Sequence, residues 1–129
     1  MFYLDTSAAM KLVVAERGST ALRRWLEPRA ERVFGSDLLR TELLRATQRT
    51  APERMVQARA VLDSLVMLRL STAICERAAT LEPSLLRSLD ALHLAAAVDL
   101  GDELEAFVTY DDRLAGAARA HGISVVAPT

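Results

Sequence analysis

The amino-acid sequence predicts an α/β protein in which a parallel sheet of about five strands is covered by helices on both faces. Two observations carry this prediction. Short apolar runs typical of buried strands alternate with helix-length segments along the whole chain, which is the pattern of β-α-β units. The chain has 129 residues, 51% of them hydrophobic, which is enough for one domain over residues 1–129.

Five short segments rich in aromatic and branched apolar residues are predicted to be strands. Each is separated from the next by more than a dozen residues, and connections of that length favour parallel pairing, because a parallel pair needs a long crossover. The predicted strands cover residues 2–4, 32–35, 66–70, 106–109 and 124–126.

Seven helices are predicted in the segments between these strands. Proline and glycine mark several of their ends: Pro28 closes the second helix, Pro52 begins the fourth, and Gly101 and Gly122 follow the sixth and the seventh. The predicted helices cover residues 7–15, 19–28, 38–49, 53–64, 72–82, 88–100 and 112–120.

Composition narrows the class of protein. A formal net charge of −1 argues against a surface that is basic all over. Among the 16 basic residues only Lys11 is a lysine, and the arginines that make up the rest suit bidentate phosphate contacts. An excess of arginine over lysine is also typical of GC-rich genomes, which is the simpler explanation. Cys75 stands alone, which excludes an internal disulfide and a multi-cysteine zinc site.

The sequence favours a cytoplasmic protein. The N-terminus carries no basic segment followed by a long apolar run, so no secretion signal is expected. No uncharged apolar run approaches the roughly 18 residues that a membrane span requires.

Four acidic residues occupy positions where an isolated charge would be costly to bury. Asp5 and Asp111 follow the first and fourth predicted strands, and the carboxyl ends of parallel strands are where ligands bind in open α/β sheets. Glu42 shares one helix stripe with apolar neighbours, and Asp90 opens a segment that is apolar nearly all round. A divalent cation that held all four would offset the cost of burying them.

Each acid also has a plain structural explanation. Asp5 and Asp111 could cap the helices that follow them, and Asp90 could complement a helix dipole in its first turn. Four such placements together favour a shared metal site. Oxygen ligands suit Mg²⁺ or Mn²⁺, whereas two histidines and one cysteine are too few for a zinc cage. His93 lies three residues after Asp90 and could contact it, and it is expected to be an oriented core histidine rather than a ligand. His121 is expected to be exposed.

Four sequence blocks, in this order, resemble the PIN-domain family, and specifically the small VapC-like ribonuclease toxins of type II toxin–antitoxin pairs. Each block is short and weakly specific, but four in order at this spacing are strong, and the resemblance spans residues 2 to about 126. The blocks are residues 3–8 (YLDTSA), 41–46 (TELLRA), 89–97 (LDALHLAAA) and 108–114 (VTYDDRL).

The resemblance implies a metal-dependent endoribonuclease on a PIN-like three-layer α/β/α fold, neutralised by a cognate antitoxin. It implies that Asp5, Glu42, Asp90 and Asp111 form the acidic site, in which Mg²⁺ or Mn²⁺ acts as a Lewis acid and activates water for RNA hydrolysis. Asp112 could replace Asp111, or be the helix cap instead. The side chains expected to support the site by hydrogen bonds are Thr6, Ser7 and Thr109.

Partners follow from the same resemblance. The RNA substrate would be bound at unpaired bases, since side chains cannot read the major groove of duplex RNA. The arginines beside the blocks are candidates for phosphate contacts, although each could equally belong to a solvated helix face. Helices near residues 7–28 and 53–65 could hold an amphipathic antitoxin segment, and a homodimer is expected. The candidate arginines are Arg40, Arg45, Arg87 and Arg113.

Two other classes of protein compete with this interpretation. A response-regulator receiver or a haloacid-dehalogenase-like phosphatase needs a lysine near its acidic pocket, and the phosphatase needs a second aspartate two residues after the first. Here the single lysine is Lys11, and Asp5 is followed by Thr6 and Ser7. A PIN-like RNA- or partner-binding module without turnover is the remaining alternative.

Overall fold

A five-stranded sheet in which every neighbouring pair is parallel forms the centre of the molecule. The computed structural model describes all residues from 1 to 129. The spatial order of the strands is β3-β2-β1-β4-β5, and this confirms the predicted fold class. The strands are β1 (Phe2–Leu4), β2 (Val33–Ser36), β3 (Val66–Leu68), β4 (Ala106–Val108) and β5 (Val125–Val126).

Seven α-helices fill the connections between the strands, and each overlaps a predicted helix. A 3-10 turn at Glu27–Arg32 takes the place of the predicted end of the second helix, and one at Pro52–Arg54 takes the place of the predicted start of the fourth. A third 3-10 turn covers Gly101–Glu103. The helices are α1 (Thr6–Val13), α2 (Ser19–Leu26), α3 (Asp37–Thr50), α4 (Met55–Asp63), α5 (Thr72–Ala79), α6 (Ser88–Val98) and α7 (Asp112–Ala120).

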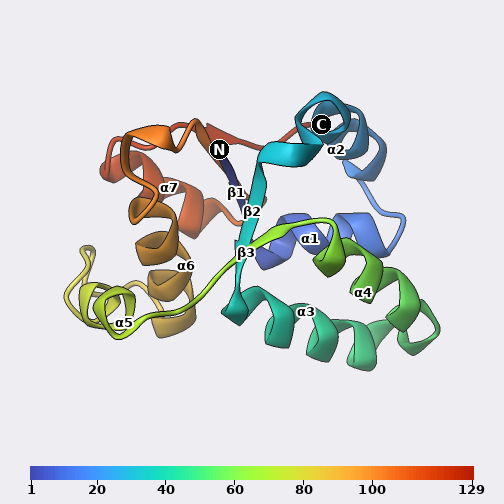
Figure 1. Ribbon diagram of the computed structural model, residues 1–129, viewed down its shortest axis with the longest axis horizontal. Helices are drawn as coiled ribbons and strands as arrows, with labels where there is room; N and C mark the ends of the chain where they lie inside the picture. The colour runs from blue at the N-terminus through green and yellow to red at the C-terminus, as the bar shows by residue number, and fades with distance from the viewer.

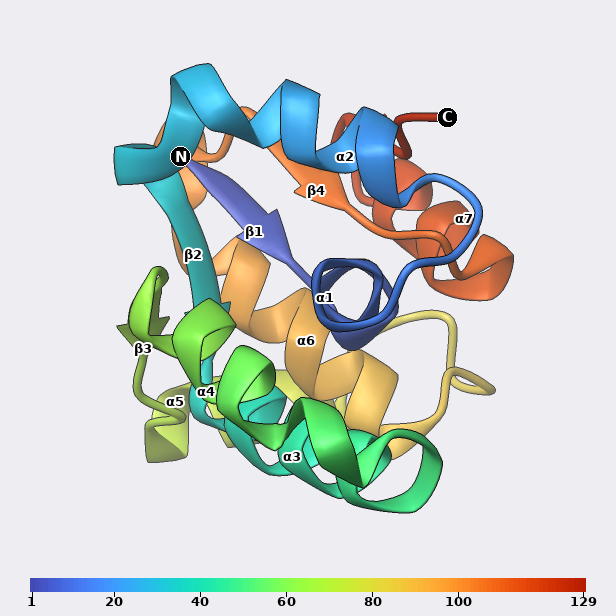
Figure 2. The same ribbon diagram turned by 90° about the vertical axis from the view of Figure 1, so that its right-hand side faces the viewer.

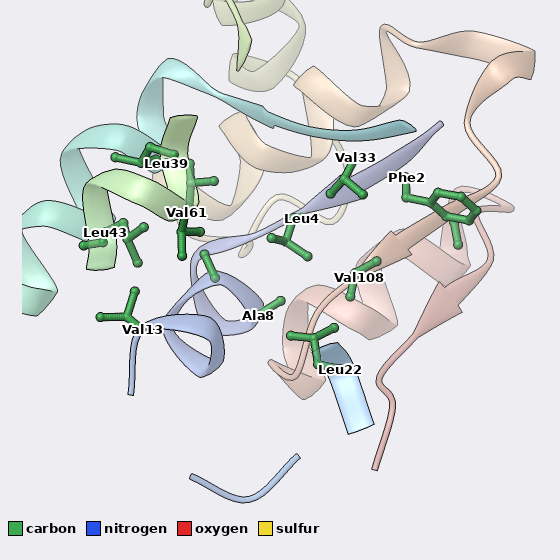
Figure 3. Packing of buried hydrophobic residues seen from close by; sticks show 14 residues of the cluster. Phe2, Leu4, Ala8, Val13, Leu22, Val33, Leu39, Leu43, Val61 and Val108 are labelled. Carbon is green, nitrogen blue, oxygen red and sulfur yellow. The ribbon is translucent and has the colours of Figure 1, made fainter. Parts of the chain in front are cut away.

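The helices form two layers, one on each face of the sheet. Helices α1 to α4 lie on one side and α5 to α7 on the other (Figure 1). Alternation along the strands supplies both layers, because successive side chains point to opposite faces. Phe2 and Leu4 pack under α1 to α4, together with Val108 (Figure 3), whereas Tyr3 and Phe107 belong to the cluster under α5 to α7.

The order in which strands are added to the sheet reverses between β1 and β4. From β1 the chain moves outward to β2 and β3, then returns to the other side of β1 through α5 and α6. A crevice opens at such a reversal, at the carboxyl ends of the two central strands. Leu4 is paired with Val108 there, so the segments that follow β1 and β4 leave the sheet side by side (Figure 2).

Candidate active site at the carboxyl edge of the sheet

Asp5 is the most deeply buried of the four acids, with 3% of its surface exposed. It leaves β1 and is the N-cap of α1, where its Oδ1 accepts hydrogen bonds from the Ala8 amide at 3.0 Å and the Ser7 hydroxyl at 2.7 Å. Its Oδ2 accepts a hydrogen bond from the Thr109 hydroxyl at 2.6 Å. Asp5 therefore caps α1, as the structural explanation predicts, and it also lies in the crevice.

Burial raises the pKa of Asp5 above its ordinary value of 3.8, because the charged form loses its hydration. The hydrogen bonds from Thr109, Ala8 and Ser7 act in the opposite direction without cancelling the effect of burial. Asp5 is thus a carboxyl group fixed in direction by the protein, whose charged form would gain from a nearby cation.

Thr109 and Ser7 connect the ends of the two central strands. The Thr109 hydroxyl donates to Asp5 and accepts from the Asp111 amide at 3.1 Å. The Ser7 hydroxyl donates to Asp5 and accepts from the Tyr110 amide at 2.9 Å. These two hydroxyls hold the segment after β4 against the segment after β1, and so fix where Asp111 lies relative to Asp5.

Glu42 lies in the middle of α3, with its side chain 23% exposed. Its Oε1 accepts a hydrogen bond from the Thr6 hydroxyl at 2.6 Å and lies 2.6 Å from Nε2 of His93. Burial alone would raise the pKa of Glu42, but the bonds from His93 and Thr6 hold it below its ordinary value of 4.5. Glu42 is therefore an ionised carboxylate that is tied to residues on α1 and α6.

His93 belongs to a buried polar chain that links Glu42 to the core. Its Nδ1 lies 2.8 Å from the hydroxyl of Tyr3, and that hydroxyl donates to Ser36 at 2.9 Å. Only 2% of His93 is exposed. The prediction of an oriented core histidine is confirmed, but its partner is Glu42. Tyr3 and Ser36 were not identified from the sequence as partners of His93. Only strand alternation, which turns Tyr3 toward α6, could have indicated Tyr3.

Asp90 lies in the first turn of α6 and is partly exposed. Burial raises its pKa above the ordinary value of 3.8, and the negative charges of Asp111 and Glu42 raise it further, while His93 and Arg87 act in the opposite direction. The charges of Asp111 and Glu42 therefore act on Asp90, and Asp111 is tied to Asp5 through the Thr109 hydroxyl.

Asp111 and Asp112 differ in their contacts. Asp111 is the N-cap of α7, and its Oδ1 accepts from the amides of Arg113 at 2.9 Å and Leu114 at 3.1 Å. Asp112 is exposed in the first turn of α7. Asp111 is therefore the helix cap, and its charge acts on Asp90.

Oxygen atoms without a protein partner remain at this site. Oε2 of Glu42, Oδ2 of Asp111 and both oxygens of Asp90 accept no hydrogen bond from the protein. No three acidic, histidine or cysteine side chains lie close enough to make a ready-formed metal cage. Mg²⁺ commonly uses one or two protein carboxylates and keeps several waters, so this oxygen-only donor set fits Mg²⁺ or Mn²⁺.

The four candidate arginines are all exposed, and none of them forms an ion pair. Arg40 and Arg45 lie on α3. Arg87 and Arg113 line a groove of about 770 Å³ together with Asp90. This α7 groove runs between the 82–87 segment and the surface of α7, and it begins at the acidic site.

His121, the apolar residues of three helices and the absence of a membrane span were also predicted. His121 is exposed, as predicted, and its Nε2 lies 2.6 Å from the carbonyl oxygen of Glu82. Most apolar residues of α1, α2 and α4 are core, and the large exposed one among them is Val56. No helix has the length and apolar character needed to cross a membrane.

Comparison with known proteins shows the family to which the chain belongs. A family model described as the PIN domain matches residues 2–120. The chain is 43% identical over 132 aligned positions to Ribonuclease VapC47 of Mycobacterium tuberculosis, covering 99% of this chain and 97% of the relative. The name of that relative agrees with the activity that the sequence predicts.

Solved structures share the fold. The crystal structure of Mycobacterium tuberculosis VapC20, described as a sarcin-ricin loop cleaving toxin, superposes with a TM-score of 0.78 at 17% identity, over 99% of this chain and 100% of that one. A toxin–antitoxin complex from Klebsiella pneumoniae superposes with a TM-score of 0.75 at 20% identity, over 100% and 98%. With a family model that matches most of its length and a relative similar from end to end, the chain belongs to the PIN-domain family.

Proposed function

We propose that this protein is a VapC-type endoribonuclease that uses Mg²⁺ or Mn²⁺ bound by Asp5, Glu42, Asp90 and Asp111. The observation that supports the proposal is the placement of Asp5 and Asp111 at the reversal point of the sheet, linked through Thr109. Carboxylate oxygens without a protein partner remain on Asp111, Glu42 and Asp90. The end-to-end similarity to a ribonuclease supports the same activity.

Each residue has a part that follows from its contacts. Asp5 is held by Thr109, Ser7 and Ala8, so its carboxylate keeps one direction. Glu42 is kept ionised by its hydrogen bonds and presents Oε2. Such preorganisation is useful because a site that is already oriented loses little free energy when the substrate reacts.

Asp90 and Asp111 complete the set from the other side. The charge of Asp111 raises the pKa of Asp90, and Asp90 is partly exposed, so a cation bound on this side would stabilise the ionised form of Asp90. A bound Mg²⁺ or Mn²⁺ supplies Lewis acidity at the phosphate and activates water. The partly exposed position of Asp90 leaves the site open to an RNA strand.

Phosphate recognition is assigned to the arginines beside the acids. Arg87 and Arg113 are the better candidates, because they share the α7 groove with Asp90. Arg40 and Arg45 are exposed on α3 and are available for more distant phosphates. A guanidinium without an ion pair can bind phosphate without first breaking an existing contact.

A toxin of this type would be neutralised by an antitoxin, and the similarity in fold to a chain from a toxin–antitoxin complex supports such a partner. Val56 on α4 offers an exposed apolar side chain on the α1, α2 and α4 side of the molecule. The expected homodimer remains a prediction, which light scattering of the purified protein would test.

Incubation of the purified protein with total cellular RNA tests the proposal. The reactions contain Mg²⁺, Mg²⁺ with excess EDTA, or Mg²⁺ with the Asp90→Asn variant. Asp99→Asn is the matched control, because it makes the same substitution at the exposed far end of α6. Discrete cuts by the wild type and by Asp99→Asn, but not with EDTA or Asp90→Asn, would support the nuclease.

Two other outcomes would argue against it. Cleavage that persists in EDTA would exclude the cation. Absence of cleavage by a wild type that still binds Mg²⁺ would favour the RNA- or partner-binding module instead.

A further inference from the structure

Small residues on one face of α7 leave the space of the α7 groove. Its floor is one face of α7, where Gly116, Ala117 and Ala120 succeed each other with minimal side chains. A Cβ added to Gly116 would meet no atom within 4 Å. The 82–87 segment forms the opposite wall with apolar side chains that include Leu85 and Leu86.

The groove has two chemically different ends. At the acidic site, Arg87 and Arg113 bring two positive charges that no carboxylate neutralises in an ion pair. At the far end His121 binds the carbonyl of Glu82, which ties the wall to the end of α7. Glu82 also lines the groove, so its negative charge would repel a polyanion, whereas Arg87 and Arg113 would attract one.

From this polarity we propose that the α7 groove is the subsite for one unpaired nucleotide of the RNA substrate, next to the bond that is cut. The inference rests on the proposed function and adds the place of the base. Arg87 and Arg113 bind the phosphate, and the base lies on the apolar surface formed by α7 and the 82–87 segment. The volume of about 770 Å³ lies in the range of small-ligand sites.

The chemistry of the walls favours a nucleotide over a protein segment. A base has two apolar faces and a phosphate attached through the sugar, which matches an apolar floor beside two cations. Leu85 is 95% exposed and would cover the outer face of such a base. The groove also begins at Asp90, so its occupant is continuous with an RNA strand whose reacting phosphate lies at the acids.

Gly116 provides the test, because a Cβ added there would meet no atom within 4 Å, so a side chain at this position starts in open space on the groove floor. Gly116→Phe blocks the base, whereas Gly116→Ala leaves most of the space open. Both replace a helix-interior glycine, so both should keep or raise the melting temperature. Cellular RNA cut by the wild type with Mg²⁺ first gives the cleavage site, and an oligonucleotide with that site is the substrate for kinetics.

We expect Gly116→Phe to raise KM by about tenfold or more, the effect of losing one bound base. Gly116→Ala, which adds a single methyl group to the groove, should raise KM by clearly less. Equal KM values for the two variants would overturn the inference while leaving the nuclease intact. Failure of the wild type to cut any RNA would overturn the proposed function and the inference with it.

A second pair of variants tests the phosphate end. Arg113→Ala should weaken oligonucleotide binding and reduce its dependence on salt by about one ion, because one phosphate contact is lost. Arg119→Ala, an exposed arginine of the same helix outside the groove, should change neither. If Gly116→Phe prevented binding of the antitoxin but not of RNA, the groove would belong to the protein partner, which contradicts the inference.

Discussion

The Nε2 atom of His93 lies 2.6 Å from Oε1 of Glu42. An ionised carboxylate only accepts hydrogen bonds, so Nε2 carries the hydrogen and the imidazole donates it. Because Nδ1 of the same ring is held at 2.8 Å by the hydroxyl of Tyr3, the ring cannot turn without breaking a buried contact. His93 is therefore held in place by the core, and it fixes the position of the Glu42 carboxylate in the candidate active site.

Two amide substitutions of His93 separate its two contacts. In His93→Gln the amide nitrogen can take the place of Nε2 and still donate to Glu42. In His93→Asn it takes the place of Nδ1 and reaches only toward Tyr3. Both should cost about 1–3 kcal/mol of stability, because a buried polar contact is lost in each.

Cleavage should separate the two variants where stability does not. We expect His93→Gln to cut RNA about tenfold faster than His93→Asn, since a charged hydrogen bond of this kind is worth about that much in rate. Single-turnover cleavage and thermal melting measure the two quantities. Equal rates would mean that His93 has a role in folding and none in orienting Glu42.

Asp90→Asn should abolish cleavage and leave the metal-free protein as stable as the wild type or more stable. The pKa of Asp90 is raised in the folded protein above its ordinary value of 3.8. Between these two values the folded state binds more protons than the unfolded state, so the free energy of unfolding falls as pH rises through that window and stays lowered at neutral pH. Asparagine carries no charge, so this loss disappears.

Urea unfolding at several pH values, with EDTA present, measures the effect. The difference between Asp90→Asn and the wild type should be small at pH 3 and should favour the variant at pH 7. A variant that is clearly less stable at pH 7 would show that Asp90 serves α6 through its dipole and not a cation site.

Substitutions of Asp5 should change the stability of the protein to different extents but should all remove its cleavage activity. Asp5→Asn keeps an oxygen for the Ala8 amide and the Ser7 hydroxyl and loses only the acceptor of the Thr109 hydroxyl, so it should cost about 1 kcal/mol of stability. Asp5→Ala removes the helix cap and leaves the buried Thr109 hydroxyl without its acceptor, which should cost about 2–3 kcal/mol. Both variants should be inactive in cleavage. An active Asp5→Asn would reduce Asp5 to a helix cap.

Asp111 and Asp112 differ in their expected effects although they are neighbours. Asp111→Asn keeps a capping oxygen for the amides of α7 and loses a charge that faces Asp90, so it should fold normally and cleave at least tenfold more slowly. Asp112→Asn should cleave as the wild type does, because Asp112 is exposed and apart from the acids. The reverse order of activities would move the fourth acid to Asp112.

Much of the fold was predictable because its signals are local. Strand alternation and helix-breaking residues are properties of neighbouring positions, and the seven helices and five strands followed from them. The place of Asp5 was also predictable, since an acid directly after a central parallel strand must lie at the carboxyl edge. Asp111 follows β4 in the same way.

Contacts between segments far apart in the sequence could not be predicted from such local signals. The bond between Glu42 and His93 depends on how α3 and α6 meet across the end of the sheet, which no local pattern fixes. Sequence proximity suggested Asp90 as the partner of His93, but residues three apart on a helix can be directed to different neighbours. The α7 groove depends on the irregular 80–87 segment, whose course has no periodic signal.

Calorimetric titration of Mg²⁺ into the metal-free protein tests most directly whether the four acids share a cation. Wild type, Asp90→Asn and the control Asp99→Asn are compared at neutral pH and low salt. We predict saturable binding to the wild type and to Asp99→Asn, and binding at least tenfold weaker to Asp90→Asn, because one of the carboxylates is removed. Absence of binding to the wild type, or equal binding by all three proteins, would contradict the shared site.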